Sequence, residues 1–572
     1  MRTGLTVVVL LAVSVVLLVV VPPIREGLLA VRPASLGHAW PMGTSIERAV
    51  RREPEDALLW LALAEAAADL SRTAEMARAE PSAFPPVTPP ATPPAEAYQR
   101  ALDLAADSPV VLLRYGMYCL AQAGDFAREE ELRGQNPAQP LPLRSPEEKA
   151  SLRQAEGLFA RCAQLMPGNA GPDYFLAWAR LAERRDDEAL GLLRGALAKS
   201  TWDLGDRAAA EAILRLVDKA GMPAGTRALY ARCAGCDNRM PIHARLRSLA
   251  RVLVGLGDGF RAAGRHGDAI LCYESGVHIG HLVRDQAYDM IDGLVGVAVS
   301  AISGGSLLPA REAQQINATS KSQEQRVERT TQAKIAAFAD YLRHHGRADL
   351  ASFYERDMQE ALRWKQDARA ATRDTLPRTM RLVSGGGVLN AGAVWLMAAA
   401  FAVFALWVGL ISLALRYWRE PRTPLRFSQL QWIVLLLVAV VPAQVAALAW
   451  GVSGFDRPAE RWPSSLGTMW VALALGLLLW LVGAVHLSLR ARARLSPGEQ
   501  RGSGRTCLAG LRALLAPTLA ALVLLCVVSF WPLRAGAQRV EQRDRELIVQ
   551  GEARYYGLGS GHPGPVGPPP GR

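Results

Sequence analysis

The chain has 572 residues, which is too long for a single compact domain and enough for about three. Half of the residues are hydrophobic and 21% are charged, but the two kinds are segregated along the chain, as is typical of a protein partly embedded in a membrane. The net charge of +12 does not indicate a nucleic-acid-binding surface, because most of the excess lies in two short arginine-rich loops, residues 416–429 and 490–512.

The first predicted element is the uncharged apolar run of residues 5–21, which follows Arg2. The run is longer than the apolar core of most signal peptides, and Pro22 and Pro23 follow it. The first pattern suited to cleavage, Gly37 and Ala39 around His38, lies far downstream. We therefore predict that residues 1–24 are an uncleaved transmembrane anchor. A cleaved signal peptide is the alternative, and either one exports the residues that follow.

The middle of the chain contains a repeat with a period of 34 residues. Small residues at this spacing let the two helices of a pair approach closely, while a large apolar residue fills the space between them. One copy and its repeat are Ala155, Phe159 and Cys162, followed by Leu176 and Ala177, then Ala189, Leu193 and Ala196. A second stretch has Leu256, Gly257, Phe260, Gly264, Ala269, Tyr273 and Gly276. A third has Ile46, Ala49, Pro54, Trp60, Leu63 and Ala64, and a weaker one has Leu342, Gly346 and Ala351.

These are signature positions of the tetratricopeptide repeat family, which residues 45–365 resemble in a broken register. The resemblance implies an all-α solenoid of stacked helix pairs, in which Gly257 allows close helix approach and Gly264 sits in the turn of a pair. It also implies a concave groove for a protein or peptide partner. Pro-rich stretches at residues 81–94 and 137–146 interrupt the pattern and are predicted to be linkers or surface loops. A helical bundle without repeats is the alternative.

Four further uncharged runs follow this exported domain, which we place at residues 25–384. They cover residues 388–415, 430–452, 467–489 and 513–533, and each is long enough to cross a bilayer as a helix. They predict a four-helix transmembrane domain at residues 385–534. The positive-inside rule places the loops 416–429 and 490–512, which hold ten arginines, in the cytoplasm. The N-terminus is then cytoplasmic. The repeat domain and the tail, residues 535–572, are exported, and the tail is predicted to be disordered from about residue 557.

The sharpest local motif is Cys233 and Cys236, a CxxC pair with His243 nearby. Together they resemble half of a zinc site, but a closed site needs four ligands and the chain has no second CxxC. In an exported domain a disulfide between the two cysteines is favoured, with buried free thiols and a metal site as alternatives. The histidine pairs His278/His281 and His344/His345 are predicted to be solvated or helix-capping residues rather than ligands.

No catalytic, cofactor-binding or nucleotide-binding motif occurs in the sequence, so we predict neither an enzyme nor a cofactor. The patterns favour a scaffold in a bacterial inner membrane, whose repeat domain binds a protein or peptide partner in the cell envelope. Two alternatives stay open. One is an accessory subunit of a larger membrane complex for transport or polysaccharide export, and the other is a redox or metal-handling protein that uses Cys233 and Cys236.

Overall fold

The computed structural model describes residues 42–79, 89–123, 144–221, 227–304, 307–308, 310–319, 322–374, 427–435, 478–491, 493–494, 514, 542 and 545–558. Throughout these residues the regular elements are α-helices, and the only extended pairing is a single bridge between Asn169 and Thr201. The all-α fold class is therefore confirmed for the described part of the chain.

The chain divides into two compact units. The first, here called the hydrophobic unit, comprises residues 1–36, 223–226 and 375–542, and the second, the helical unit, comprises residues 37–222, 227–374 and 543–572. Of the five predicted spans, residues 5–21 and 388–415 lie outside the described residues, and the others are described only in part. Within the described residues, no helix has both the length and the apolar character needed to cross a bilayer.

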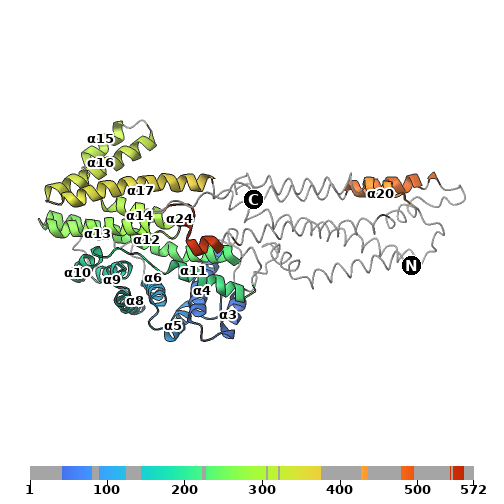
Figure 1. Cartoon of the computed structure of the whole chain (residues 1–572), viewed down its shortest axis with the longest axis horizontal. Coiled ribbons are helices and arrows are strands. Elements are labelled where there is room, and N and C mark those ends of the chain that lie inside the picture. The colour runs from blue at the N-terminus through green and yellow to red at the C-terminus, as the bar shows by residue number, and fades with distance from the viewer. Residues whose placement is uncertain are drawn as a thin grey trace. The chain divides into compact units, whose positions relative to one another are not determined.

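The described part of the helical unit is a succession of helices (Figure 1). Its first half contains α3 (Met42–Arg52), α4 (Ala57–Ala79), α5 (Pro94–Leu104), α6 (Pro109–Gln122), α8 (Pro146–Leu165), α9 (Gly171–Ala182), α10 (Asp186–Leu197) and α11 (Asp206–Lys219). Its second half contains α12 (Arg227–Ala262), α13 (His266–Asp285), α14 (Met290–Ser303), α15 (Ala310–Thr319), α16 (Gln323–His344), α17 (Ala348–Asp374) and α24 (Glu552–Tyr555). The described part of the hydrophobic unit includes α20 (Gln429–Leu435) and a helical stretch at residues 478–491.

Two prolines from the predicted linkers begin helices instead. Pro94 and Pro146 occupy the first turns of α5 and α8, where the missing N–H of proline costs nothing because it would have no partner in the helix. Ser145 and Glu148 complete the start of α8 with a capping box. The ends of the two Pro-rich stretches are therefore helix starts, while residues 80–88 and 124–143 lie outside the described part.

Three helix pairs, α9–α10, α12–α13 and α16–α17, share one turn. In each, a residue with a left-handed backbone ends the first helix, and the N–H of the following arginine donates to the carbonyl five residues earlier, which is the Schellman geometry. The left-handed residues are Arg184 (φ 60°), Gly264 (φ 77°) and Gly346 (φ 77°). The bonds run from Arg185 to Arg180 (3.0 Å), from Arg265 to Phe260 (2.8 Å) and from Arg347 to Leu342 (2.9 Å).

The arginine of each turn also pairs with an acidic residue early in the second helix. These pairs are Arg185–Glu188 (2.6 Å), Arg265–Asp268 (2.6 Å) and Arg347–Asp349 (3.4 Å). The same turn, arginine and acidic partner thus recur in three hairpins, a form of internal repetition beyond the small-residue pattern.

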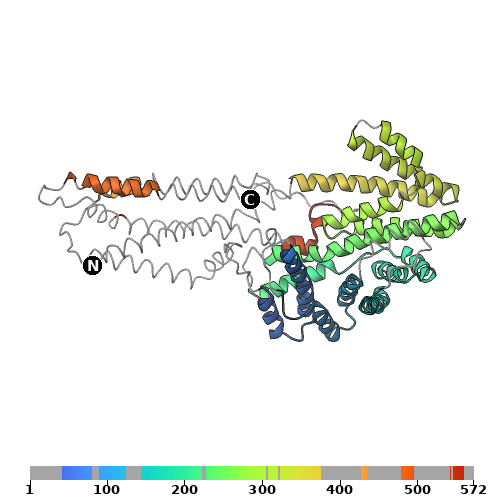
Figure 2. The ribbon, with the colours of Figure 1, turned by 180° about the vertical axis from the view of Figure 1, so that it is seen from behind.

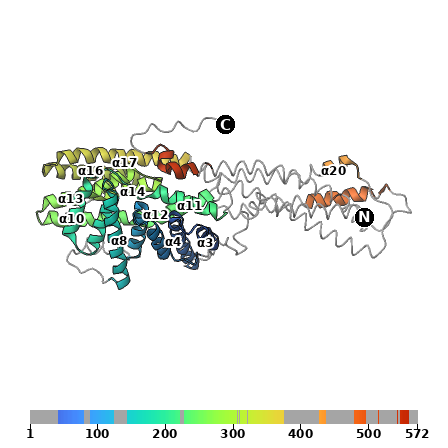
Figure 3. The ribbon, with the colours of Figure 1, turned by 60° about the horizontal axis from the view of Figure 1, so that its bottom comes forward.

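Helix α4 lies inside the helical unit rather than at one end of a stack. Leu59, Leu61 and Leu63 are each 1% exposed or less although they point to different sides of the helix, and a helix that is apolar on every side must be surrounded. It contacts α3, α5, α11 and α12, and Figure 3 shows α3, α4 and α11 close together. In an extended solenoid each pair touches only its neighbours in sequence, so the described helices pack more compactly than the predicted solenoid.

Glycines bring α13 and α14 into direct backbone contact, and the two helices run side by side in Figures 1 and 2. A Cβ atom added to Gly280 would lie 2.6 Å from the carbonyl oxygen of Gly296, and one added to Gly296 would lie 2.6 Å from the carbonyl oxygen of Gly280. Backbone atoms cannot move aside as a side chain can, so neither position has room for a larger residue.

Candidate functional site

The predicted packing residues lie where helices of the helical unit meet. Gly257 and Gly276 face the side chains of Tyr273 and Ser303, and a Cβ atom on Gly257 would lie 2.6 Å from the Tyr273 ring. Gly264 forms the turn between α12 and α13. Trp60, Leu256 and Phe260 are partly buried against the core, and Trp60 also donates its indole N–H to the carbonyl of Pro54 (2.8 Å). The fully or almost fully buried members are Ala49, Ala155, Phe159, Cys162, Leu176, Ala177, Ala189, Leu193, Ala196, Ala269 and Tyr273.

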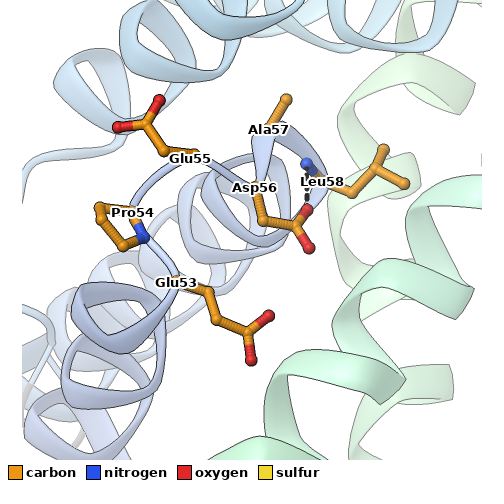
Figure 4. Close-up of a pocket in the computed structure, with 6 residues that line it drawn as sticks. All are labelled: Glu53, Pro54, Glu55, Asp56, Ala57 and Leu58. Carbon is orange, nitrogen blue, oxygen red and sulfur yellow. Dashed lines mark hydrogen bonds between the residues drawn. The ribbon is translucent and has the colours of Figure 1, made fainter.

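One hollow lies beside the turn between α3 and α4 and is lined by six consecutive residues, 53–58 (Figure 4). Its polar groups have structural partners. The Asp56 carboxylate accepts the N–H of Leu58 (3.0 Å) at the start of α4, and Arg215 of α11 pairs with the same carboxylate (2.5 Å). Lys219 pairs with Glu53. The acidic groups of this turn therefore cap α4 and hold α11, and they form no convergent site.

A second hollow of about 470 Å³ is lined by residues from distant parts of the helical unit. Its apolar wall includes Trp202, Ile242 and Val283, and its other side includes Gln550 and Arg554 from the far C-terminal end of the chain. Most of the residues that the sequence analysis singled out lie elsewhere. Only His243 belongs both to the predicted candidates and to this hollow.

His243 and Asp292 form a buried pair at the edge of this hollow. The ring Nε2 lies 2.5 Å from the Asp292 carboxylate, and the two residues are 4% and 7% exposed. The other carboxylate oxygen accepts the N–H groups of Tyr288 (3.1 Å) and Asp289 (3.0 Å) at the start of α14. Nδ1 of His243 is buried and has no hydrogen-bond partner among the described residues. The pair therefore joins α12 to α14 at the edge of the hollow.

The position of His243 bears on the metal site that Cys233, Cys236 and His243 suggested in the sequence. His243 and Cys236 are seven residues apart on α12, a rise of about 10.5 Å at 1.5 Å per residue, and the His243 Nε2 already contacts Asp292. Within the described residues no three His, Cys, Asp or Glu side chains gather in a way that could hold a metal ion. The side chains of Cys233 and Cys236, and therefore their predicted disulfide, lie outside the described part of the structure.

His278 and His281 are half-buried on α13 and contact residues of other helices, so the prediction that they are solvated or capping residues is wrong. The Tyr174 hydroxyl lies 2.7 Å from His278 Nδ1, and burial, aided by the charge of His281, lowers the pKa of His278 to about 4. His281 contacts Asp357 of α17 (2.7 Å). Burial opposes its protonation, but the hydrogen bond to Asp357 and the charges of Asp285 and Asp357 together outweigh burial and raise the pKa of His281. The pKa values of these two histidines, which lie one turn apart on α13, are therefore shifted in opposite directions.

The feature that the sequence analysis missed is the docked C-terminal end, residues 545–558, here called the tail segment. It belongs to the helical unit, and α24 lies beside α14 (Figure 1). The backbone N–H of Ala553 donates to the carbonyl of Tyr288 (3.1 Å), and the Tyr288 hydroxyl donates to the carbonyl of Ile548 (2.8 Å). The available signal was a pair of glycines, Gly551 and Gly557, around a short amphipathic stretch.

Comparison with protein-family models, with curated proteins and with solved structures finds no match for this chain.

Proposed function

We propose that the protein is a membrane-anchored scaffold whose helical unit binds a polypeptide partner at the cell envelope, without catalysis. The observation that carries this proposal is the tail segment itself. The helical unit holds a 14-residue stretch of polypeptide through main-chain hydrogen bonds, buried apolar side chains and an ion pair. An amphipathic helical peptide is bound in the same way, with its apolar side chains as anchors in a groove, and helical repeat domains bind partners on extended concave surfaces.

The tail segment also supports the proposed topology. Because residues 545–558 pack against the same unit as residues 42–374, both must lie in one compartment. The chain between them would then cross a membrane an even number of times, as four spans do. Large apolar side chains are exposed on the described helices of the hydrophobic unit, including Leu430 (71%) and Val482 (58%). Exposed apolar surface of this kind favours contact with lipid or with another protein.

Thiol labelling tests the topology. We expect a variant with Cys507 as its only cysteine to resist an impermeant thiol reagent on intact spheroplasts and to react after lysis, because the loop 490–512 is predicted to be cytoplasmic. The matched control carries a single cysteine at Val549→Cys in the tail segment, where the native side chain is 44% exposed, and it should react before lysis. Labelling of Cys507 on intact spheroplasts would overturn the proposed orientation.

Partner capture tests the binding function. Gly257→Leu drives a side chain into the Tyr273 ring, which should cost roughly 1–3 kcal/mol of folding free energy through overpacking and reduce the capture of polypeptides from native membranes. Gly259→Leu is the matched control, because no atom lies within 4 Å of a Cβ added there. The measurement is a pull-down with the full chain in detergent, with circular dichroism to follow folding. A folded chain that captures no polypeptide and turns over a small substrate would contradict the scaffold proposal.

A further inference from the structure

The tail segment has a defined shape that two glycines set. Residues 545–550 are helical, Gly551 has a left-handed backbone (φ 84°), and the short helix α24 follows. A Cβ atom on Gly551 would lie 2.9 Å from the Tyr288 carbonyl oxygen, so this close approach requires glycine. Gly557 (φ 70°) ends α24, and the N–H of Leu558 donates to the carbonyl of Ala553 (2.8 Å). The segment is a compact helix-glycine-helix unit.

One side of this unit is buried and the other is open. Leu547, Ile548 and Ala553 are each 1% exposed or less, and Leu558 is 6% exposed, whereas Val549 is 44% exposed. Ile548 belongs to the same apolar core as the helix pairs of the helical unit. The buried residues therefore act as side-chain anchors, of the kind that an amphipathic peptide places in a groove.

The surface beneath the tail segment, here called the cradle, is formed by Asp218 at the end of α11, Tyr288 before α14, and Met290 at the first position of α14. Tyr288 makes both main-chain contacts described above. The Met290 N–H donates to the Glu552 carboxylate (3.4 Å), where a negative charge is favoured by the helix N-terminus. Arg545 pairs with both oxygens of Asp218 (2.9 and 3.0 Å). The tail segment thus contacts the cradle through the basic Arg545, the apolar Ile548, Gly551 and the acidic Glu552.

We propose that the cradle is the peptide-binding site of the scaffold, that the chain's own tail segment occupies it, and that a partner polypeptide with the same pattern displaces the tail segment. This inference rests on the proposed function. The hollow of about 470 Å³ lies along the same contact and has Gln550 and Arg554 in its lining, so an incoming peptide has room to engage before the tail segment leaves. Because the tail segment is tethered, its effective concentration is high, and a free peptide competes poorly while the anchors are intact.

The test uses a fluorescent synthetic peptide of residues 543–558 and the full chain in detergent micelles, with binding followed by anisotropy. Ile548→Asp in the chain removes the main anchor and leaves the cradle unchanged, so we expect it to bind the peptide at least about tenfold more tightly than the unmodified chain. Val549→Asp alters the exposed neighbour and should leave peptide binding unchanged. A chain that ends at Gln542 lacks the tail segment entirely and should behave like the Ile548→Asp variant.

A cradle variant completes the design. Tyr288→Ala, added to the chain that ends at Gln542, should abolish peptide binding because it removes the hydroxyl donor and the apolar surface of the ring. If the truncated chain stays folded by circular dichroism and binds the peptide no better than the unmodified chain, the inference is wrong. If it captures polypeptides from membranes to the same extent as the unmodified chain, the partner binds elsewhere and only the proposed function stands. If neither chain captures any, the proposed function fails as well.

Discussion

The hairpin α12–α13 and the junction of α4, α6 and α11 are held together by different means. In the hairpin, residues close in sequence meet across a short turn, and small residues let apolar surfaces fit together. In the junction, Arg114 of α6 binds Glu65 of α4 and Asp206 of α11, which are 49 and 92 residues away in the chain. Local contacts leave a periodic pattern in the sequence, whereas a distant polar contact leaves only isolated charged residues.

The junction is the more demanding arrangement, because its charged groups are buried and each needs a partner of opposite charge. Arg114 and Glu65 are 2% and 1% exposed, and the guanidinium binds both oxygens of the Glu65 carboxylate (2.7 and 2.9 Å). The Tyr98 hydroxyl also donates to Glu65 (2.9 Å), and burial together with the Glu65 charge raises the pKa of Tyr98 well above its ordinary value. Burial alone would lower the pKa of Arg114, but the charge and hydrogen bonds of Glu65, together with the charge of Asp206, outweigh burial and raise it.

Breaking the junction should have the largest effect on stability. Arg114→Met removes the cation and leaves the Glu65 carboxylate buried without its main partner, which we expect to cost about 3–5 kcal/mol. Arg207→Met is the control, because the Arg207–Glu211 pair is 59% and 43% exposed and should contribute about 0–1 kcal/mol. Urea unfolding followed by tryptophan fluorescence measures both. Equal losses of unfolding free energy in the two variants would show that the buried cluster contributes no more to stability than an exposed ion pair.

Adding a methyl group to a helix glycine should have an intermediate effect on stability, and its sign depends on how closely another helix packs against that glycine. Gly280→Ala sets a methyl group against the backbone of α14 and should destabilise the fold by about 1–3 kcal/mol. Gly191→Ala in α10 meets no atom within 4 Å and should stabilise the fold by about 0.5–1 kcal/mol, because alanine has the higher helix propensity. Thermal unfolding of both variants checks the prediction. Stabilisation by Gly280→Ala would show that α13 and α14 are not in direct backbone contact.

The smallest expected effect is on the pH dependence of folding stability, to which His278 and His281 of α13 contribute with opposite sign. His278 has a folded-state pKa of about 4, below its ordinary value of 6.5, so the unfolded chain binds a proton that the folded chain excludes, and stability falls as pH drops below 6.5. His281 has a raised pKa, so its contribution is present below 6.5 and is lost as pH rises through the folded-state pKa. His278→Gln should therefore reduce the loss of stability between pH 7 and pH 5, and His281→Gln should increase it.

Ring-proton titration by NMR measures these two histidines directly. We expect one ring to titrate near the low value and the other above 6.5, with assignments from the two glutamine variants. Similar pKa values for both rings would mean that Tyr174 and Asp357 do not create the different environments described for them.

The residues of the candidate site fall into the same two classes as the contacts of the fold, those that local spacing predicts and those that only distant packing defines. The packing residues, such as Ala155, Gly257 and Tyr273, could be predicted because a helix pair repeats them at fixed spacing. His243 was singled out for its distance from Cys236 in the sequence, but its partner in the structure is Asp292, which only the packing of α12 on α14 brings near. Arg184 could not be predicted as a turn residue, because an arginine seldom adopts the left-handed backbone that Gly264 and Gly346 adopt readily.

The sequence by itself determined that the described chain is all-α and predicted where small residues let helices meet, because helix periodicity and side-chain size act over a few turns. Only the tertiary structure decided that α4 is surrounded, that Arg114 joins three helices, that Gly280 and Gly296 meet, and that the tail segment returns to Tyr288. These contacts join residues that local patterns do not relate. Their energy comes from complementary surfaces that exist only after the helices have packed.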